Sequence, residues 1–139
     1  MSHRIEMRVR YLECDMQGVV FNSWYQAWID DAVDCWLRDH DPHFESAGWE
    51  VMLKRFEITW DAPAVFGDRV AIDLDVPRWG NTSFDVAAHL SVVASRDAGR
   101  IGTHVAEAVV TYVAVDAEDH RPIPVPADLR RHLGGGSAP

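Results

Sequence analysis

Four long segments in the second part of the chain constrain the fold more than any other feature. They cover residues 49–60, 69–78, 84–95 and 101–116, and each reads as a strand. Each is bounded by Gly, Pro, Asn or Asp, as expected where a chain turns. Because the last three are joined by short turns, antiparallel pairing is expected, and the four segments together predict a meander.

The first part of the chain contains one strand pattern and one helix pattern. Residues 4–12 alternate roughly between apolar and polar side chains, which indicates a half-buried strand. Residues 23–39 switch to apolar side chains three or four positions apart, which is the spacing of a helix. Asn22 or Ser23 can supply the N-cap, and Pro42 predicts that the helix ends shortly before it.

The order of strand, helix and four strands predicts an α+β fold in which a five-stranded antiparallel sheet wraps one long helix. The other face of the sheet, or an edge, needs a cover, and self-association is the simplest one. The length of 139 residues suits one domain, which we place at residues 1–133. The Gly-rich residues 134–139 are expected to form a flexible tail.

Composition argues against several classes of protein. The formal net charge of −9 disfavours a nucleic-acid-binding protein, because phosphate binding requires a basic face. No apolar run approaches the roughly 18 residues that a membrane span needs. The cysteines, Cys14 and Cys35, form no C-x-x-C motif, and no secretory segment is recognisable at the start. We therefore expect free thiols and a cytoplasmic location.

A recognisable motif lies in the loop before the predicted helix. It consists of Asp15, Gly18, Val19, Val20, Phe21, Asn22 and Tyr25. Further matching stretches are residues 8–11, 62–68, 79–83 and 123–124, together with Leu129. The pattern resembles the hot-dog fold acyl-CoA thioesterases. It is most similar to the 4-hydroxybenzoyl-CoA thioesterase family, which includes the Tol-Pal-associated acyl-CoA thioesterases. The resemblance extends over residues 4–133 and implies a hot-dog fold and hydrolysis of an acyl-CoA.

The chemistry of thioester hydrolysis fits this loop. A carboxylate such as Asp15 can activate water as a general base or attack the carbonyl as a nucleophile. From the residues alone, Asp15 could equally form a turn by accepting a backbone N–H. The resemblance implies that Asp15 carries the reaction. It also implies that the N–H of Asn22, with Ser23, holds the oxyanion, because the first N–H groups of a helix lack intrahelical partners.

Other residues are expected to bind the substrate. They are Gly18, Val19, Val20, Phe21, Tyr25, Thr82 and Ser83. Helix packing is the alternative for Tyr25, and a bond to the local backbone is the alternative for the two turn hydroxyls. Arginine suits the geometry of phosphate, so arginines near the turns are candidates for CoA binding. These arginines are Arg78, Arg96 and Arg100.

No cofactor and no metal are expected. His40 and His43, beside Asp39 and Asp41, are the only cluster with ligand-like spacing in the sequence, and they lack a further His or Cys partner. The sequence contains no serine-hydrolase elbow, P-loop or dinucleotide motif.

The sequence therefore predicts an acyl-CoA thioesterase that assembles as a homodimer or homotetramer with active sites at the subunit interface. A thioesterase for acyl carrier-protein substrates and a non-catalytic acyl-CoA-binding module are the alternatives. A hot-dog dehydratase is disfavoured because such enzymes pair the aspartate with a nearby His, and residues 4–39 contain none.

Overall fold

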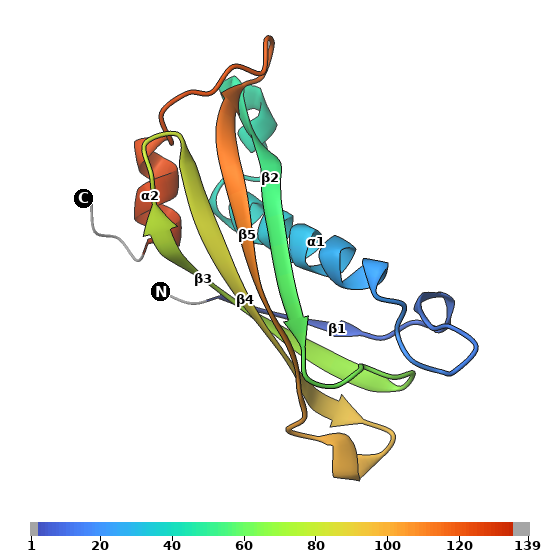
Figure 1. Ribbon diagram of the computed structural model, residues 1–139. Coiled ribbons are helices and arrows are strands. Elements are labelled where there is room, and N and C mark those ends of the chain that lie inside the picture. The colour runs from blue at the N-terminus through green and yellow to red at the C-terminus, as the bar shows by residue number, and fades with distance from the viewer. Residues whose placement is uncertain (1–2, 135–139) are drawn as a thin grey trace.

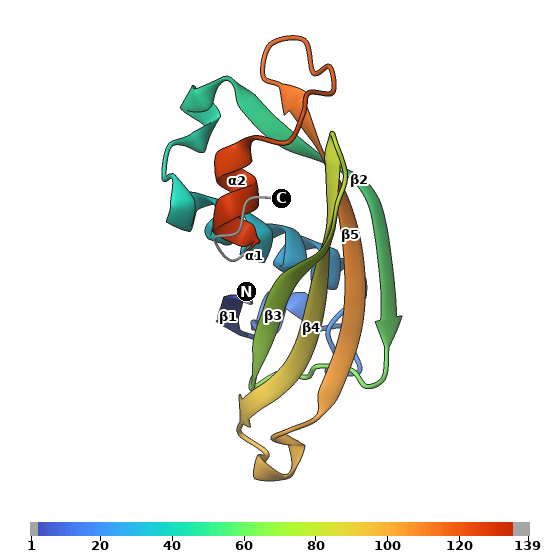
Figure 2. The ribbon, with the colours of Figure 1, turned by 90° about the vertical axis from the view of Figure 1, so that its left-hand side faces the viewer.

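A sheet of antiparallel strands lies against helix α1 on one of its faces (Figures 1 and 2). The computed structural model describes residues 3–134, apart from the side chains of residues 44 and 45. The strands are β1 (His3–Arg8), β2 (Trp49–Trp60), β3 (Asp68–Trp79), β4 (Ser83–Ser95) and β5 (His104–Asp116). The helices are α1 (Ser23–His40) and α2 (Ala127–Leu133), with 3-10 turns at Tyr11–Glu13, Phe44–Ala47 and Ala98–Arg100. The expected five-stranded antiparallel sheet and its long helix are confirmed.

The strand order differs from the expected meander. The sheet runs β1-β3-β4-β5-β2, and all neighbouring strands are antiparallel. Strands β3, β4 and β5 do form a meander, but β2 pairs with β5 and not with β3. The expectation was wrong because α1 crosses one face of the sheet, so the chain leaves the helix at the edge opposite β1. Residues 61–67 then return the chain to β3, which lies beside β1.

The core lies between α1 and the sheet. The buried residues of α1 are Tyr25, Trp28, Ile29, Ala32, Val33, Trp36 and Leu37. They share one apolar cluster with buried residues of the three central strands, such as Ile72, Leu90 and Val110. Burial of one such side chain contributes roughly 1.5–3 kcal/mol. This packing fixes the position of α1, and with it the position of the loop that precedes the helix.

The short helix α2 was not predicted from the sequence. Its residues Leu129 and Leu133 are buried, and the helix contacts α1 and β3. A helix of 7 residues presents too few apolar repeats to be distinguished from a loop. Beyond Gly134, the expected tail lies outside the described residues. Of the helices in residues 3–134, none is both long enough and apolar enough to cross a membrane.

Candidate active site

The loop between β1 and α1 presents Asp15 at a tight, exposed turn. The Asp15 N–H donates to the Val19 carbonyl at 2.9 Å, and the Gly18 N–H donates to the Asp15 carbonyl at 3.0 Å. Gly18 has a φ of +81°, a left-handed conformation that glycine adopts without strain. The Asp15 Oδ1 accepts from the Gln17 N–H at 2.8 Å. No residue in the described range bonds to its Oδ2, so one carboxylate oxygen is available to a substrate or a water.

A fully buried carboxylate, Glu13, anchors this loop to the helix. Its Oε2 accepts from the Trp28 indole N–H at 2.7 Å and from the Arg10 guanidinium at 2.8 Å. Its Oε1 accepts from the Arg10 backbone N–H at 2.7 Å. Burial alone would raise the pKa of Glu13, but the hydrogen bonds from Arg10 and Trp28 outweigh it, and the pKa is lowered. Glu13 is therefore a buried anion that fixes the chain two residues before Asp15.

The segment after β2 holds the other side of the loop. The Val20 N–H donates to the Ala64 carbonyl at 2.9 Å, and the Phe21 N–H donates back to the Glu13 carbonyl at 2.9 Å. Val19 forms an isolated bridge with Val65. Val19 and Val20 are thus held by backbone pairing, and Phe21 stays 46% exposed at the surface.

The start of α1 leaves backbone donors unpaired. The Trp24 N–H donates to the Phe21 carbonyl at 3.0 Å, whereas the N–H groups of Asn22 and Ser23 have no hydrogen-bond partner among residues 3–134. Asn22 has helical backbone angles, and its side chain makes no capping bond to the described chain. Asn22 is therefore the N-cap residue of α1, as expected, but its side chain does not cap the helix within the described chain. The unpaired N–H groups lie at the positive end of the helix dipole.

Asn22, at this helix start, borders a hollow of about 290 Å³. It is lined by Val20, Asn22, Tyr25, Trp60, Asp61, Ala62 and Pro63. The Tyr25 hydroxyl accepts from the Ala64 N–H at 3.0 Å, and its ring packs edge-on against Trp28 and Trp60. Burial raises the pKa of Tyr25. Tyr25 is therefore a core residue that also forms part of the wall of the hollow.

Asp15 faces a second hollow of about 440 Å³. Its lining comprises Tyr11, Cys14, Asp15, Met16, Gly18, Phe66 and Arg96. The Arg96 guanidinium lies 4.8 Å from the centre of the Phe66 ring. Burial raises the pKa of Cys14, which keeps this thiol protonated and a poor nucleophile. Of the arginines expected to bind CoA, Arg96 therefore lies in the same hollow as Asp15. Asn22 lines the other hollow of the same chain.

The turn between β3 and β4 lies far from this loop, beside α2 at the other end of the sheet (Figure 1). Arg78 binds the Asp85 carboxylate at 2.9 Å and the Ser83 hydroxyl at 3.0 Å. The Thr82 carbonyl accepts from the Ala114 N–H at 2.8 Å. Within one chain, the structure therefore does not bring Arg78, Thr82 or Ser83 to Asp15.

Arg100 takes part in an internal ion pair. Its guanidinium binds both oxygens of the fully buried Asp68 at 2.9–3.2 Å and the Pro63 carbonyl at 2.8 Å. Asp68 also accepts from the Val65 N–H at 2.9 Å and from the Ser95 hydroxyl at 2.7 Å. Burial would raise the pKa of Asp68, but the bonds led by Arg100 lower it. Arg100 thus supports the segment 61–67 that holds the Asp15 loop.

The family of the chain follows from its sequence and agrees with this geometry. A family model described as the thioesterase-like superfamily matches residues 9–133, which include the Asp15 loop, α1 and strands β2–β5. The chain belongs to this superfamily. The expected class of enzyme, a thioester hydrolase, is confirmed at this level. A comparison with curated proteins found no match.

Solved structures of thioesterases share the fold of this superfamily member. The 4-hydroxybenzoyl-CoA thioesterase of Pseudomonas sp. strain CBS-3 is 22% identical with a TM-score of 0.83, over 94% of this chain and 98% of that one. A 1,4-dihydroxy-2-naphthoyl-CoA thioesterase from Synechocystis is 20% identical with a TM-score of 0.82, over 100% of both chains. The dynemicin thioesterase is 22% identical with a TM-score of 0.87, over 100% of this chain and 99% of that one. The hot-dog fold is confirmed.

The buried acids Glu13 and Asp68 were not identified from the sequence. Both stand near turns, where a carboxylate usually faces water, so nothing local indicates that either is buried. One sequence signal for the pairing of Glu13 is Arg10, three residues before it, because side chains at this spacing meet across one turn of a 3-10 helix.

Proposed function

We propose that this member of the thioesterase-like superfamily hydrolyses an acyl-CoA to the free acid and CoA. The observation that carries the proposal is the Asp15 carboxylate, held at an exposed turn with one oxygen unbound. As a general base, Asp15 takes a proton from the water that attacks the thioester carbon, and the C–S bond breaks as the CoA thiolate leaves. As a nucleophile, Asp15 attacks that carbon itself, and water then cleaves the mixed anhydride.

The oxyanion is stabilised at the start of α1. The unpaired N–H groups of Asn22 and Ser23 support this role, because preorganised donors aimed at a developing negative charge lower the barrier of acyl transfer. The tight turn at Gly18 and the pairing of Val19 and Val20 with the segment 61–67 keep the loop rigid. Phe21 and Tyr25 are apolar surfaces for the acyl group.

The proposed substrates are acyl-CoA thioesters with a bulky or aromatic acyl group. The Pseudomonas relative is named for 4-hydroxybenzoyl-CoA and the Synechocystis relative for 1,4-dihydroxy-2-naphthoyl-CoA. The hollow at the start of α1 has Tyr25 and Trp60 in its wall, which suits an aromatic ring. Arg96 is the best candidate for the CoA phosphates, since Arg78 and Arg100 already bind Asp85 and Asp68.

A homodimer with shared active sites is the proposed assembly. Strand β2 is an edge of the sheet and carries the exposed apolar residues Met52, Leu53 and Trp60. An unpaired edge of this length is a template for pairing with a second copy. The hollow of Asp15 and that of Asn22 are separate in one chain, which supports a site completed by a second copy.

The test is thiol release from short-chain, long-chain and aromatic acyl-CoA substrates by wild type and Asp15→Asn. The expected result is cleavage of at least one substrate and a loss of about 10²-fold or more in the variant, because a general base contributes on this scale. The matched control is Asp119→Asn. Asp119 accepts a backbone N–H two residues ahead, just as Asp15 does, but it follows β5.

The alternatives give different results. Wild type that binds acyl-CoA without cleaving it would be a binding module. Cleavage of acyl carrier-protein thioesters but not of acyl-CoA would mean that the acyl carrier is a protein, with the same thioester hydrolysis. Equal rates for wild type and Asp15→Asn would mean that Asp15 only forms its turn.

A further inference from the structure

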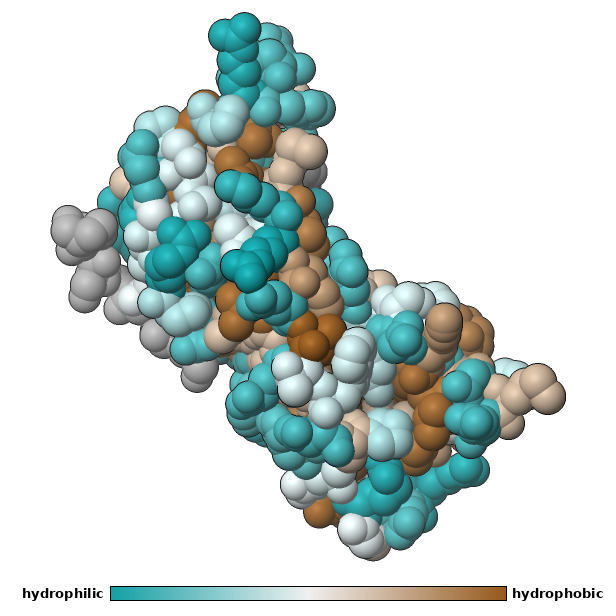
Figure 3. Space-filling view, in the orientation of Figure 1, coloured by the Kyte–Doolittle hydropathy of each residue, from teal (hydrophilic) through white to brown (hydrophobic). Residues whose placement is uncertain are grey.

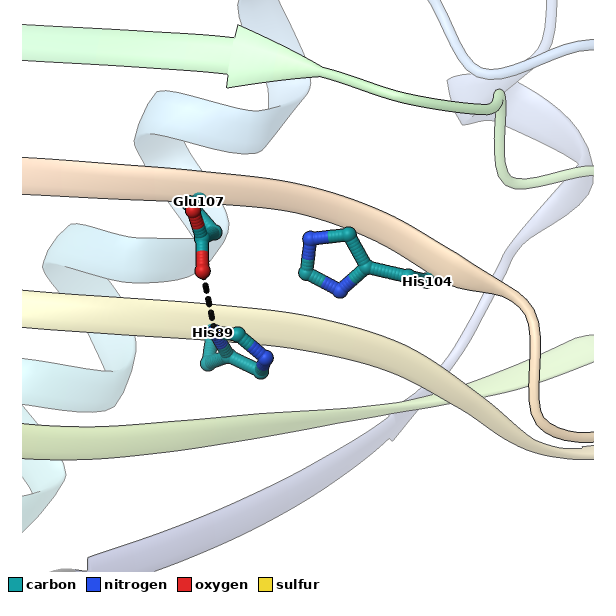
Figure 4. A group of neighbouring side chains, drawn as sticks. All are labelled: His89, His104 and Glu107. Atoms are coloured by element: carbon teal, nitrogen blue, oxygen red, sulfur yellow. Dashed lines mark ion pairs between the residues drawn. The ribbon is translucent and has the colours of Figure 1, made fainter.

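Three side chains with metal-binding groups meet on the face of the sheet opposite α1. They are His89 on β4 and His104 and Glu107 on β5 (Figure 4). One ligand atom from each lies within 4.8 Å of the others. The geometry points to a site for a divalent transition-metal ion, bound by two imidazole nitrogens and one carboxylate oxygen, with Zn²⁺ as the best-fitting ion. The inference does not depend on the thioesterase reaction.

A β-bulge brings the three side chains to one face. His89 and Glu107 are directly opposite each other in the β4–β5 ladder. His104 is three residues before Glu107, so regular alternation would place it on the opposite face. The register shifts between Leu90 and Ser91, which face Ala106 and His104, so Val105 is an additional residue in β5. A bulge of this kind turns the following side chains to the other face, and here it aligns His104 with Glu107.

The same bulge brings a fourth residue, Asp61, next to His104. The Val105 carbonyl accepts from the Asp61 N–H at 2.8 Å and from the Ala62 N–H at 3.3 Å. This tie holds the Asp61 carboxylate 3.0 Å from Nε2 of His104. Metal-binding histidines commonly donate one ring nitrogen to a carboxylate, which orients the ring and leaves the other nitrogen for the metal. Asp61 therefore orients His104 and leaves its Nδ1 for the ion.

The distances suit a small ion after slight side-chain rotation. His89 Nδ1 and Glu107 Oε1 are 3.0 Å apart, and the two imidazole rings are 4.5 Å apart between centres. Zn²⁺ bound tetrahedrally at about 2.0–2.1 Å separates its ligand atoms by about 3.4 Å. Because the side chains of His89 and Glu107 are more than half exposed, they can make this adjustment at little cost.

The surroundings favour a cation with an open coordination position. His89 and Glu107 also line a hollow of about 450 Å³, together with Asp73 and Asp75. The Asp73 carboxylate is paired with the Arg4 guanidinium, so the negative potential here comes mainly from Asp75 and Glu107, and it attracts a divalent cation. Hydrophilic and hydrophobic side chains are interspersed on this face of the molecule (Figure 3). Three protein ligands leave a fourth position of the ion for a water molecule or a small anion.

The test is a calorimetric titration of ZnCl₂ into the full chain after treatment with EDTA and desalting. We expect one ion per chain, and an affinity at least about 100-fold weaker in His89→Ala, His104→Ala and Glu107→Gln. Asp61→Asn should weaken binding by about 10–100-fold, the range for groups that orient a metal ligand. Co²⁺ in place of Zn²⁺ should give the visible absorption of a tetrahedral site in wild type.

His120→Ala is the matched control. His120 is also an exposed histidine paired with a glutamate, since its Nε2 lies 2.9 Å from Glu50, but it belongs to no group of metal-binding residues in the described chain. Binding that is unchanged in this control and lost in the three ligand variants supports the site. The absence of binding to wild type would overturn the inference. So would equal affinity in the ligand variants, or a loss of the same size in His120→Ala. Circular dichroism of each variant checks that the fold is retained.

Discussion

At the scale of single residues, a buried charge and an exposed charge stand close together in the loop of the candidate site. Glu13 is an anion that accepts three hydrogen bonds. Asp15, two positions later, lies at the surface, and only its Oδ1 accepts a hydrogen bond from the described chain. The two acids are therefore suited to different tasks. Glu13 fixes the loop by bonding to Arg10, which follows β1, and to Trp28 of α1. Asp15 has one carboxylate oxygen free for the proposed reaction.

The first prediction concerns Glu13→Gln, which keeps the shape of the side chain and removes its charge. Hydrogen bonds to a charged group contribute about 1.5–3 kcal/mol, so the free energy of unfolding should fall by about that amount. Urea unfolding at pH 7 measures the loss. Thioesterase activity should also fall, because the loop that loses the Glu13 anchor no longer holds Asp15 in place. Glu57→Gln, at an exposed ion pair with Arg55, is the control and should change the free energy of unfolding little.

The pH dependence of stability gives a second prediction. The pKa of Glu13 is lowered in the folded protein, so its contribution is present at neutral pH and is lost as the pH falls below the unfolded pKa of about 4.3. Asp68 acts in the same direction. Urea unfolding between pH 7 and pH 3 should show a steeper loss of stability for wild type than for Glu13→Gln. Parallel curves would contradict the lowered pKa.

Gly18→Ala is the third prediction at this scale. A Cβ at this position would meet no atom within 4 Å, so only the backbone angle opposes the substitution. An alanine in the left-handed region costs roughly 1–2 kcal/mol. The expected result is a modest loss of stability in thermal unfolding and a larger fractional loss of thioesterase activity, because the strained turn carries Asp15. Gly102→Ala, which also has a positive φ and open space but lies before β5, is the control.

At the scale of elements, sequence patterns predict secondary structure well and pairing poorly. Helix 23–40 and the five strands follow from apolar spacing and turn residues, because both are local properties of the chain. The position of β2 beside β5 is not local, since it depends on where α1 delivers the chain. Helix α2 escaped prediction because it has only two buried leucines.

In the candidate site too, local features could be predicted from the sequence and long-range contacts could not. The Asp15 turn and the helix start follow from one short motif, and both are present in the structure. The partners of Arg78 and Arg100 lie 7 and 32 positions away along the chain, so their internal pairing could not be read from sequence spacing. The approach of His104 to His89 depends on the bulge at Val105, which no residue pattern indicates.

At the scale of the whole molecule, β2 forms a long edge of the sheet, and no strand within residues 3–134 pairs with its outer side. A fourth prediction follows for the double variant Met52→Lys and Leu53→Lys on β2. Charges on an edge strand oppose pairing with another copy, so the variant should be monomeric and lose activity if the sites are shared. Analytical ultracentrifugation of wild type and variant measures the assembly. Val109→Lys, an exposed apolar position on central strand β5, is the control and should remain a dimer. A monomeric wild type would contradict the proposed assembly.

The place of β2 in the sheet also sets an order of events for a newly made chain. Trp49 pairs with Asp116 and Trp60 pairs with Ala106, so β2 leaves the ribosome long before the strand that it will join. Strands β3, β4 and β5 are neighbours along the chain and can assemble with little loop-closure entropy, whereas β2 must close a long loop onto a finished β5. We therefore expect β2 to take its final position after β3, β4 and β5 have paired. In the proposed dimer, we therefore expect the two copies to pair through this edge after each chain has folded.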